Sequence, residues 1–139
     1  SRGLGDVYKR QVEDQPDLLH ITDAYFRIGG SFWIARDGEK LAGTIGIMPC
    51  GNGVAVLKKF FVYEKYQGEP VHLGRQLYAV LLQFAKENGI HTLMLDTPHN
   101  TVRAHRFYEK AGFRKVSENE LPVRFSHPYA DCDFFLLEL

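Results

Sequence analysis

The segment at residues 65–75 (KYQGEPVHLGR) has the residue types of a loop that could bind an anion. It runs from an apolar stretch directly into a region of helical periodicity, where free backbone amides and the helix dipole favour negative charge. Gly68 and Gly74 let the backbone approach a ligand closely, and Arg75 would sit poorly in a first helical turn unless a phosphate shared the site. A plain strand-to-helix loop explains the same residues equally well. The GxxxxGK[ST] spacing is missing, which excludes a nucleoside-triphosphate loop.

A second group of chemically capable residues lies at 100–113 (NTVRAHRFYEKAGF). Asn100 precedes an expected helix, where its side chain would either cap free amides or bind a ligand. Ala104, Tyr108 and Ala111 share one face of that helix, and the small side chain of Ala104 leaves room for a ligand or for a neighbouring helix. Tyr108 taken alone is best explained as a core aromatic residue.

Together the two segments resemble the GNAT family of N-acetyltransferases, and the resemblance covers the chain from about Phe32 onwards. In that family a loop of the form Gln/Arg-x-x-Gly-x-Gly/Ala binds the pyrophosphate of coenzyme A. Residues 66–68 look like the start of this loop and residues 73–77 like its entry into the helix, while residues 100–113 carry the more specific ending. The resemblance implies an α/β fold with a mixed central sheet, a parallel strand–helix–strand crossover, and a V-shaped splay between the central strands.

The resemblance also implies an activity: direct transfer of an acetyl group from acetyl-CoA to a primary amine of a small molecule or a peptide, without a covalent enzyme intermediate. Tyr108 would protonate the departing thiolate, since an ordinary phenol with a pKa of about 10 can donate a proton at neutral pH. Backbone amides of the splayed strand would polarise the thioester carbonyl. The cofactor-binding residues implied are Phe60, Phe61 and Val62 for the pantetheine arm, Gln67, Gly68, Leu73, Gly74 and Arg75 for the pyrophosphate, and Asn100 with Ala104.

Two departures from the family pattern matter. Residues 69–72 lengthen the pyrophosphate loop and include a proline, which has no amide to offer. Val56 stands where many relatives carry a glutamate that acts as general base, and a valine cannot move a proton. Asp96, His99 and Asp131 are candidate bases by position only, and a structural or solvated role explains each of them better. The alternative therefore stays open that the domain binds acyl-CoA as a sensor or interaction module without transfer.

Periodicity and turn residues predict the elements that must position these groups. The spacing from Pro16 to Ile28 predicts a helix that ends at Gly29-Gly30. Residues 54–63 predict a strand buried on both faces, and the helix and strand after it complete a parallel crossover. The stretch 121–129 would either border the acceptor site or form a plain surface loop. We expect further strands at 32–35, 41–48, 90–96, 113–116 and 131–139, helices at 74–88 and 101–111, and turns at Asp37-Gly38 and at 49–53.

The composition is that of one globular domain: 139 residues, 45% hydrophobic and 24% charged. Residues 1–12 show no clean period, and we expect a cloning scar or a truncated start there, followed by a single domain at 13–139. The 17 basic residues balance the 17 acidic ones, which argues against a nucleic-acid partner. No apolar run reaches the roughly 20 residues of a bilayer span, which argues against a membrane partner.

The cysteines and histidines predict no special chemistry. Cys50 and Cys132 cannot staple a scaffold, so we expect a reducing, cytoplasmic compartment, and nothing in the sequence marks an activating partner for either thiol. The six histidines show no recognised metal spacing, so we expect no metal. The family's usual first strand and first helix are not clearly visible, and an edge strand left open there would allow a homodimer.

Overall fold

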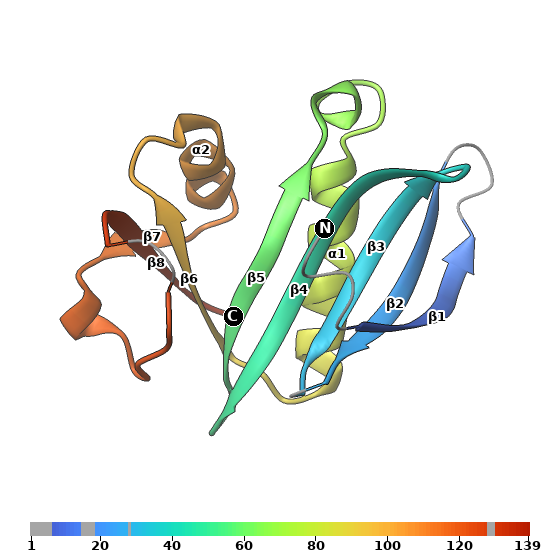
Figure 1. Cartoon of the computed structure of the whole chain (residues 1–139). Coiled ribbons are helices and arrows are strands. Elements are labelled where there is room, and N and C mark those ends of the chain that lie inside the picture. Colours follow the sequence, from blue (N-terminus) through green and yellow to red (C-terminus); the bar gives the residue numbers. More distant parts are fainter. Residues whose placement is uncertain (1–6, 15–18, 28, 128–129) are drawn as a thin grey trace. The chain divides into compact units, whose positions relative to one another are not determined.

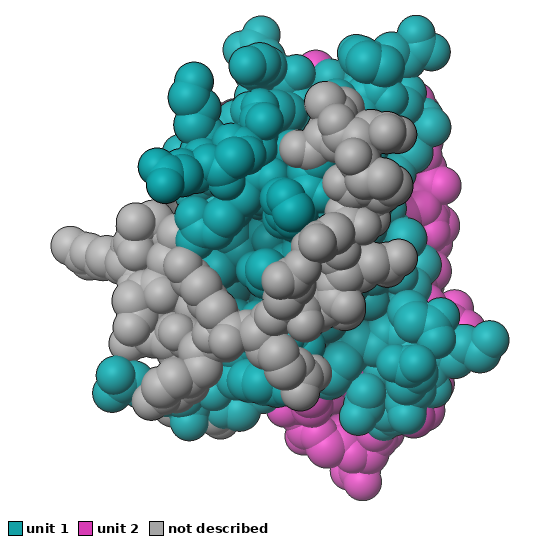
Figure 2. All heavy atoms as spheres, turned by 90° about the vertical axis from the view of Figure 1, so that its right-hand side faces the viewer, with its two compact units in different colours: residues 1–48, 57–88 teal, residues 49–56, 89–139 magenta. Residues whose placement is uncertain are grey.

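The computed structural model describes residues 7–14, 19–27, 29–127 and 130–139 (Figure 1). The chain divides into two compact units (Figure 2). The first unit consists of residues 1–48 and 57–88, and the second consists of residues 49–56 and 89–139.

The first unit is a series of neighbouring strands with one helix against a face. Its strands are β1 (Val7–Asp14), β2 (His20–Phe26), β3 (Ser31–Asp37), most of β4 (Lys40–Gly51) and the second half of β5 (Val54–Val62), adjacent in that order. Antiparallel pairing joins β1 through β4. A short 3-10 helix (Glu64–Tyr66) then leads to α1 (Leu73–Glu87).

An apolar stripe on α1 packs against these strands (Figure 1). Trp33 of β3 meets Phe84 of the helix edge-to-face, with ring centroids 5.4 Å apart. Side chains alternate along a strand, so Phe32 and Ile34 lie on the opposite face from Trp33, where they pack with Ala24. The buried residues of the helix stripe are Leu73, Leu77, Tyr78, Leu81 and Ala85.

The second unit combines parallel and antiparallel pairing. The start of β5 pairs in parallel with β6 (Thr92–Pro98), and the ladder has three pairs, from Val54↔Thr92 to Val56↔Met94. Since α1 lies between β5 and β6 in the chain, the predicted parallel crossover is confirmed. The remaining elements are α2 (Val102–Lys110), β7 (Arg114–Val116), a 3-10 helix (Glu118–Glu120) and β8 (Cys132–Glu138), which is antiparallel to both β6 and β7.

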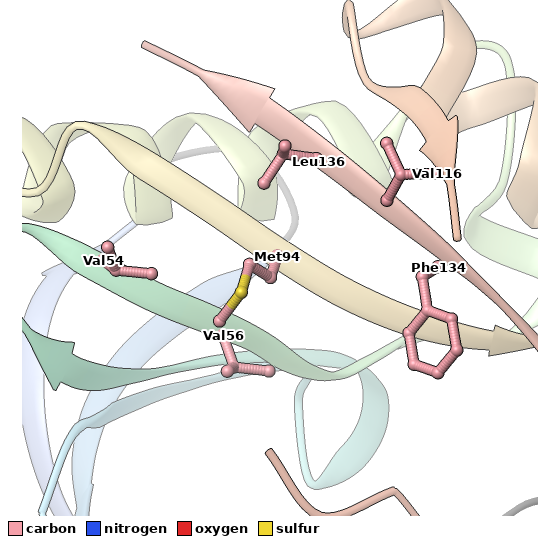
Figure 3. Packing of buried hydrophobic residues seen from close by; sticks show 6 residues of the cluster. All are labelled: Val54, Val56, Met94, Val116, Phe134 and Leu136. Carbon is pink, nitrogen blue, oxygen red and sulfur yellow. The ribbon is translucent and has the colours of Figure 1, made fainter. Parts of the chain in front are cut away.

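The core of the second unit lies on one face of its strands (Figure 3). Met94 of β6 is fully buried, with the side chain of Val56 beside it. Leu121, Val123 and Phe125, from the stretch after β7, pack against the same cluster, so part of that stretch helps to cover the core. The buried members of the cluster are Val54, Val56, Met94, Val116, Phe134 and Leu136.

The helix predicted over residues 16–28 is wrong. Residues 15–18 and 28 lie outside the described part, but His20–Phe26 forms strand β2, paired with β3 from His20↔Arg36 to Tyr25↔Ser31. An apolar run of this length fits either a helix or a strand, and pairing with the strong hairpin of β3 and β4 decides between them. Residues 7–14, which show no clean period, form β1.

Three other predictions change in detail. Strand β5 is buried on both faces only over its first four residues, because the following five alternate between partly buried and exposed. The turn expected at 49–53 shrinks to Asn52-Gly53, since β4 continues to Gly51. The other predicted strands and helices appear with shifts of one to three residues at their ends. No helix within the described residues combines the length and apolar character needed to cross a bilayer.

We expect Met94→Ala to lower the free energy of unfolding by about 2–5 kcal/mol, because it leaves a cavity in the core of the second unit. Val102→Ala is the control, since Val102 is exposed on α2. Denaturant unfolding of both variants measures the difference, and equal losses would contradict this assignment of the core.

Candidate functional site

The loop between β5 and α1 ends in an abrupt backbone turn. His72 is the N-cap residue of α1 and has a left-handed backbone with φ 47°, and Gly68 is also left-handed, with φ 64°. The amide of His72 donates to the carbonyl of Gly68 at 2.7 Å. No side chain caps the helix. The first turn of α1 therefore begins with its amide protons available to a ligand.

The predicted pyrophosphate donors divide into two groups. The amide of Gln67 donates to Glu64 O at 3.1 Å, and the amide of Arg75 donates to His72 O at 3.1 Å. The amides of Gly68, Leu73 and Gly74 make no hydrogen bond within the described part of the chain. Three of the five predicted amides are therefore free to bind an anion.

Side chains brace this loop from both ends. Gln67 Nε2 donates to the carbonyl of Val62, the last residue of β5, at 2.7 Å. Gln76 Nε2 donates to the carbonyl of Val71 at 2.7 Å. Buried Tyr66 donates its hydroxyl to Asp37 Oδ2 at 2.7 Å, and this hydrogen bond to a carboxylate raises the pKa of Tyr66. The loop is thus tied to β5, to the β3–β4 turn and to α1.

A cavity of about 390 Å³ opens beside the start of this loop. The Lys65 ammonium lies 5.6 Å from the centre of the Tyr66 ring. The sequence does not indicate this cavity, because its walls come from the beginning of β4 and from the residues after β5, and no motif links them. Its lining residues are Lys40, Leu41, Tyr63, Lys65 and Tyr66.

In the second unit, Tyr108 is only 6% exposed on the inner face of α2. Its ring centre lies 5.6 Å from that of Phe113 and 5.7 Å from that of Phe135. Ala104 and Ala111, predicted to share its face, are both partly buried. These contacts fix the direction of the Tyr108 ring, whichever role its hydroxyl has.

Asn100 does not cap α2. The N-cap residue is Thr101, and its hydroxyl donates to the carbonyl of Pro98 at 2.8 Å and accepts no capping hydrogen bond from a helix amide. The Thr101 hydroxyl also lies 2.8 Å from that of Thr97. Asn100 is exposed in the turn just before the cap, so the capping interpretation of Asn100 is wrong and its ligand-binding interpretation stays a prediction.

His99, a candidate base, is held by a carboxylate on β8. Its Nδ1 lies 3.0 Å from Asp133 Oδ2, and His105 Nε2 lies 3.7 Å from the same oxygen. Lys115 Nζ is 3.4 Å from Asp133 Oδ1. Burial pushes the pKa of Asp133 upward, but His99 and Lys115 outweigh it, so the pKa falls below its ordinary value. This cluster ties the turn before α2 to β7 and β8.

The other candidate bases gain no support. Val56 is buried at 1% exposure in the apolar cluster, so no acid stands at that position. Asp131 is exposed, and its backbone carbonyl accepts from the amide of His99 at 3.5 Å. Asp96 is partly buried on β6.

Cys132 has a histidine neighbour that the sequence does not indicate. Its Sγ lies 3.7 Å from His127 Nδ1, and His127 Nε2 lies 3.3 Å from Glu118 Oε2. Burial raises the pKa of the Cys132 thiol, and the nearby carboxylates of Asp96 and Glu118 raise it further. The thiol therefore stays protonated at neutral pH, which disfavours a nucleophilic role. Neither cysteine forms a disulfide within the described residues, and these residues hold no cluster of three or more potential metal ligands.

Comparison with known proteins gives consistent matches. The profile of the Acetyltransferase (GNAT) family matches residues 4–113. N-acetyltransferase 8B of Rattus norvegicus is 30% identical over 120 residues, which are 82% of this chain and 54% of that protein. The chain spans about half the length of the curated relatives it matches.

Two solved structures illustrate the structural likeness. An acetyltransferase from Streptococcus agalactiae is 41% identical, with a TM-score of 0.76 over 79% of this chain and 67% of that one. A GNAT family acetyltransferase from Elizabethkingia anophelis, with acetyl-CoA bound, is 21% identical, with a TM-score of 0.62 over 79% of this chain and 76% of that one. At that lower identity the likeness concerns the fold.

We expect Asp133→Asn to lower the free energy of unfolding at pH 7 by about 1 kcal/mol. Because the pKa of Asp133 is lowered in the folded state, its contribution is fully present above the unfolded-state value of about 3.9 and disappears as the pH falls through the folded-state value. Denaturant unfolding from pH 7 to pH 3 should show the two proteins converging. The exposed Asp131→Asn is the control, and a constant gap between Asp133→Asn and the wild type would contradict the prediction.

Proposed function

Because the chain belongs to the Acetyltransferase (GNAT) family, we propose that it transfers an acetyl group from acetyl-CoA to a primary amine of a small molecule or a peptide. The observation that carries the proposal is the set of three amides, of Gly68, Leu73 and Gly74, that have no partner within the described chain at the start of α1. Amides grouped at a helix N-terminus are suited to a pyrophosphate. The acetyl-CoA bound to the relative from Elizabethkingia anophelis supports the choice of donor.

The cofactor would be held chiefly by backbone groups of the first unit. Gly68, Leu73 and Gly74 would donate to the pyrophosphate, while the amides of Gln67 and Arg75 first serve the loop itself. Main-chain groups of residues 60–62 would pair with the pantetheine arm like an added strand. The ammonium groups of Lys40 and Lys65, which line the neighbouring cavity, would attract phosphates.

Tyr108 would supply the proton for the leaving group, as the family resemblance implies. The uncharged amine attacks the thioester carbon, the C–S bond breaks, and the thiolate takes the phenolic proton of Tyr108. Tyr108 suits this role because its aromatic neighbours fix the ring. Val56 offers no base, so the proton of the amine would leave to water. Asn100 and Ala104 would contact the cofactor from the start of α2. Cys50 and Cys132 form no disulfide within the described part of the chain, which is in keeping with the proposed cytoplasmic location.

Isothermal calorimetry with acetyl-CoA, with CoA and ADP as comparisons, tests the cofactor site first. We expect saturable binding in which acetyl-CoA and CoA bind much more tightly than ADP, since only they carry the pantetheine arm. Absence of binding at millimolar ligand would overturn the proposal. Binding without thiol release across a panel of amines would instead favour the non-catalytic acyl-CoA sensor.

We expect Tyr108→Phe to lower kcat by about 100-fold and to leave the Kd for acetyl-CoA near that of the wild type, because the ring and its packing are kept. Tyr25→Phe is the control, since Tyr25 is a partly exposed tyrosine on β2. Thiol release at saturating substrate measures the rate. An unchanged kcat would remove Tyr108 from the mechanism.

A further inference from the structure

Lys59 has a backbone conformation that its residue type does not favour. Its φ is 55°, in the left-handed region, although it lies within strand β5 and carries a side chain. The other left-handed residues with side chains in the described chain are Asn52, in a turn, and His72, before a helix. Left-handed backbone is sterically unfavourable for a residue such as lysine, because its Cβ approaches the following carbonyl oxygen. Neighbouring groups must therefore hold Lys59 in place, and such residues cluster at functional sites.

A buried threonine on the adjacent strand supplies that support. Thr44 of β4 is only 1% exposed, and its hydroxyl donates to the carbonyl of Lys59 at 2.5 Å. The bond satisfies the carbonyl of the left-handed residue. Loss of the hydroxyl would leave this partly buried acceptor without this donor, which penalises the kinked backbone.

The two residues before Thr44 guide the rest of β5. A Cβ on Gly43 would lie 2.8 Å from the carbonyl oxygen of Phe61, so only a glycine allows β5 to pass this close to β4. Ala42 accepts a hydrogen bond from the amide of Tyr63 at 2.9 Å. Three consecutive residues of β4 thus contact β5 from its kink to just beyond its end.

We propose that Thr44 and Gly43 are positioning residues for acetyl-CoA: they fix the kink at Lys59 and thereby the course of the main chain at residues 60–62. The inference rests on the proposed function, because it takes these residues as the partners of the pantetheine arm. Neither residue touches the cofactor in this scheme. They act through the backbone of β5, which pairs with a ligand only if its groups are aimed correctly.

The test compares CoA binding to four single variants and to one double variant by calorimetry. Thr44→Val removes the hydroxyl and keeps the branched shape, and we expect it to raise the Kd for CoA about tenfold. Thr44→Ser keeps the hydroxyl and should retain more affinity than Thr44→Val. The matched control is Thr22→Val on β2, because the buried hydroxyl of Thr22 has no hydrogen-bond partner in the described structure; its Kd should equal that of the wild type.

The substitution Lys59→Gly distinguishes a positioning role of Thr44 from a merely structural one. Glycine adopts positive φ without the steric cost, so Thr44→Val combined with Lys59→Gly should bind CoA more tightly than Thr44→Val alone. If Thr44→Val does not fold, Lys59→Val tests the kink directly, because the Lys59 side chain is exposed and a β-branched residue opposes positive φ. We expect Lys59→Val to bind CoA about tenfold more weakly.

The outcomes separate this inference from the proposed function. A wild-type protein that does not bind CoA overturns both. A wild-type protein that binds CoA, with Thr44→Val or Lys59→Val binding equally well, overturns only the positioning role. The same holds if the glycine substitution restores no affinity to a folded Thr44→Val protein, because the loss then does not act through the backbone of Lys59.

Discussion

A backbone amide has one proton to donate, and the loop between β5 and α1 is organised by that limit. The amides of Gln67, His72 and Arg75 donate hydrogen bonds to carbonyls of the loop itself, and these bonds give the loop a defined shape. The amides of Gly68, Leu73 and Gly74 remain for a ligand. A loop with every amide satisfied internally could not bind a phosphate, and a loop with none satisfied would have no fixed shape.

In the second unit, neighbouring groups determine which side chains are ionised. The side chains of His99 and Lys115 contact the carboxylate of Asp133, so this carboxylate stays ionised and holds the turn before α2. Burial and the nearby carboxylates of Asp96 and Glu118 keep the thiol of Cys132 protonated. The rings of Phe113 and Phe135 pack on the ring of Tyr108. The protonation states of Asp133 and Cys132 are set by neighbours that come partly from distant segments of the chain.

That dependence on distant neighbours marks the limit of prediction from sequence. Both helices were predictable, and the β3–β4 turn was predicted to within one residue of its place at Gly38-Glu39, because glycine and helical periodicity act locally. Strand β2 was not, since its short apolar run needed the partner β3 to settle its conformation. The capping role assigned to Asn100 failed by one residue, because Thr101 fits the same pattern. A lysine in the sequence does not indicate a left-handed backbone, so the kink at Lys59 could be found only in the structure.

Trp33 gives this molecule a built-in optical label. It is the chain's one tryptophan, it is almost fully buried, and it packs on Phe84 within the first unit. Its fluorescence emission therefore follows the environment of that unit, whereas the far-ultraviolet circular dichroism signal sums the helices and strands of both. Coincidence of the two signals during melting would mean one cooperative transition, and separation would mean that the units lose their structure in sequence.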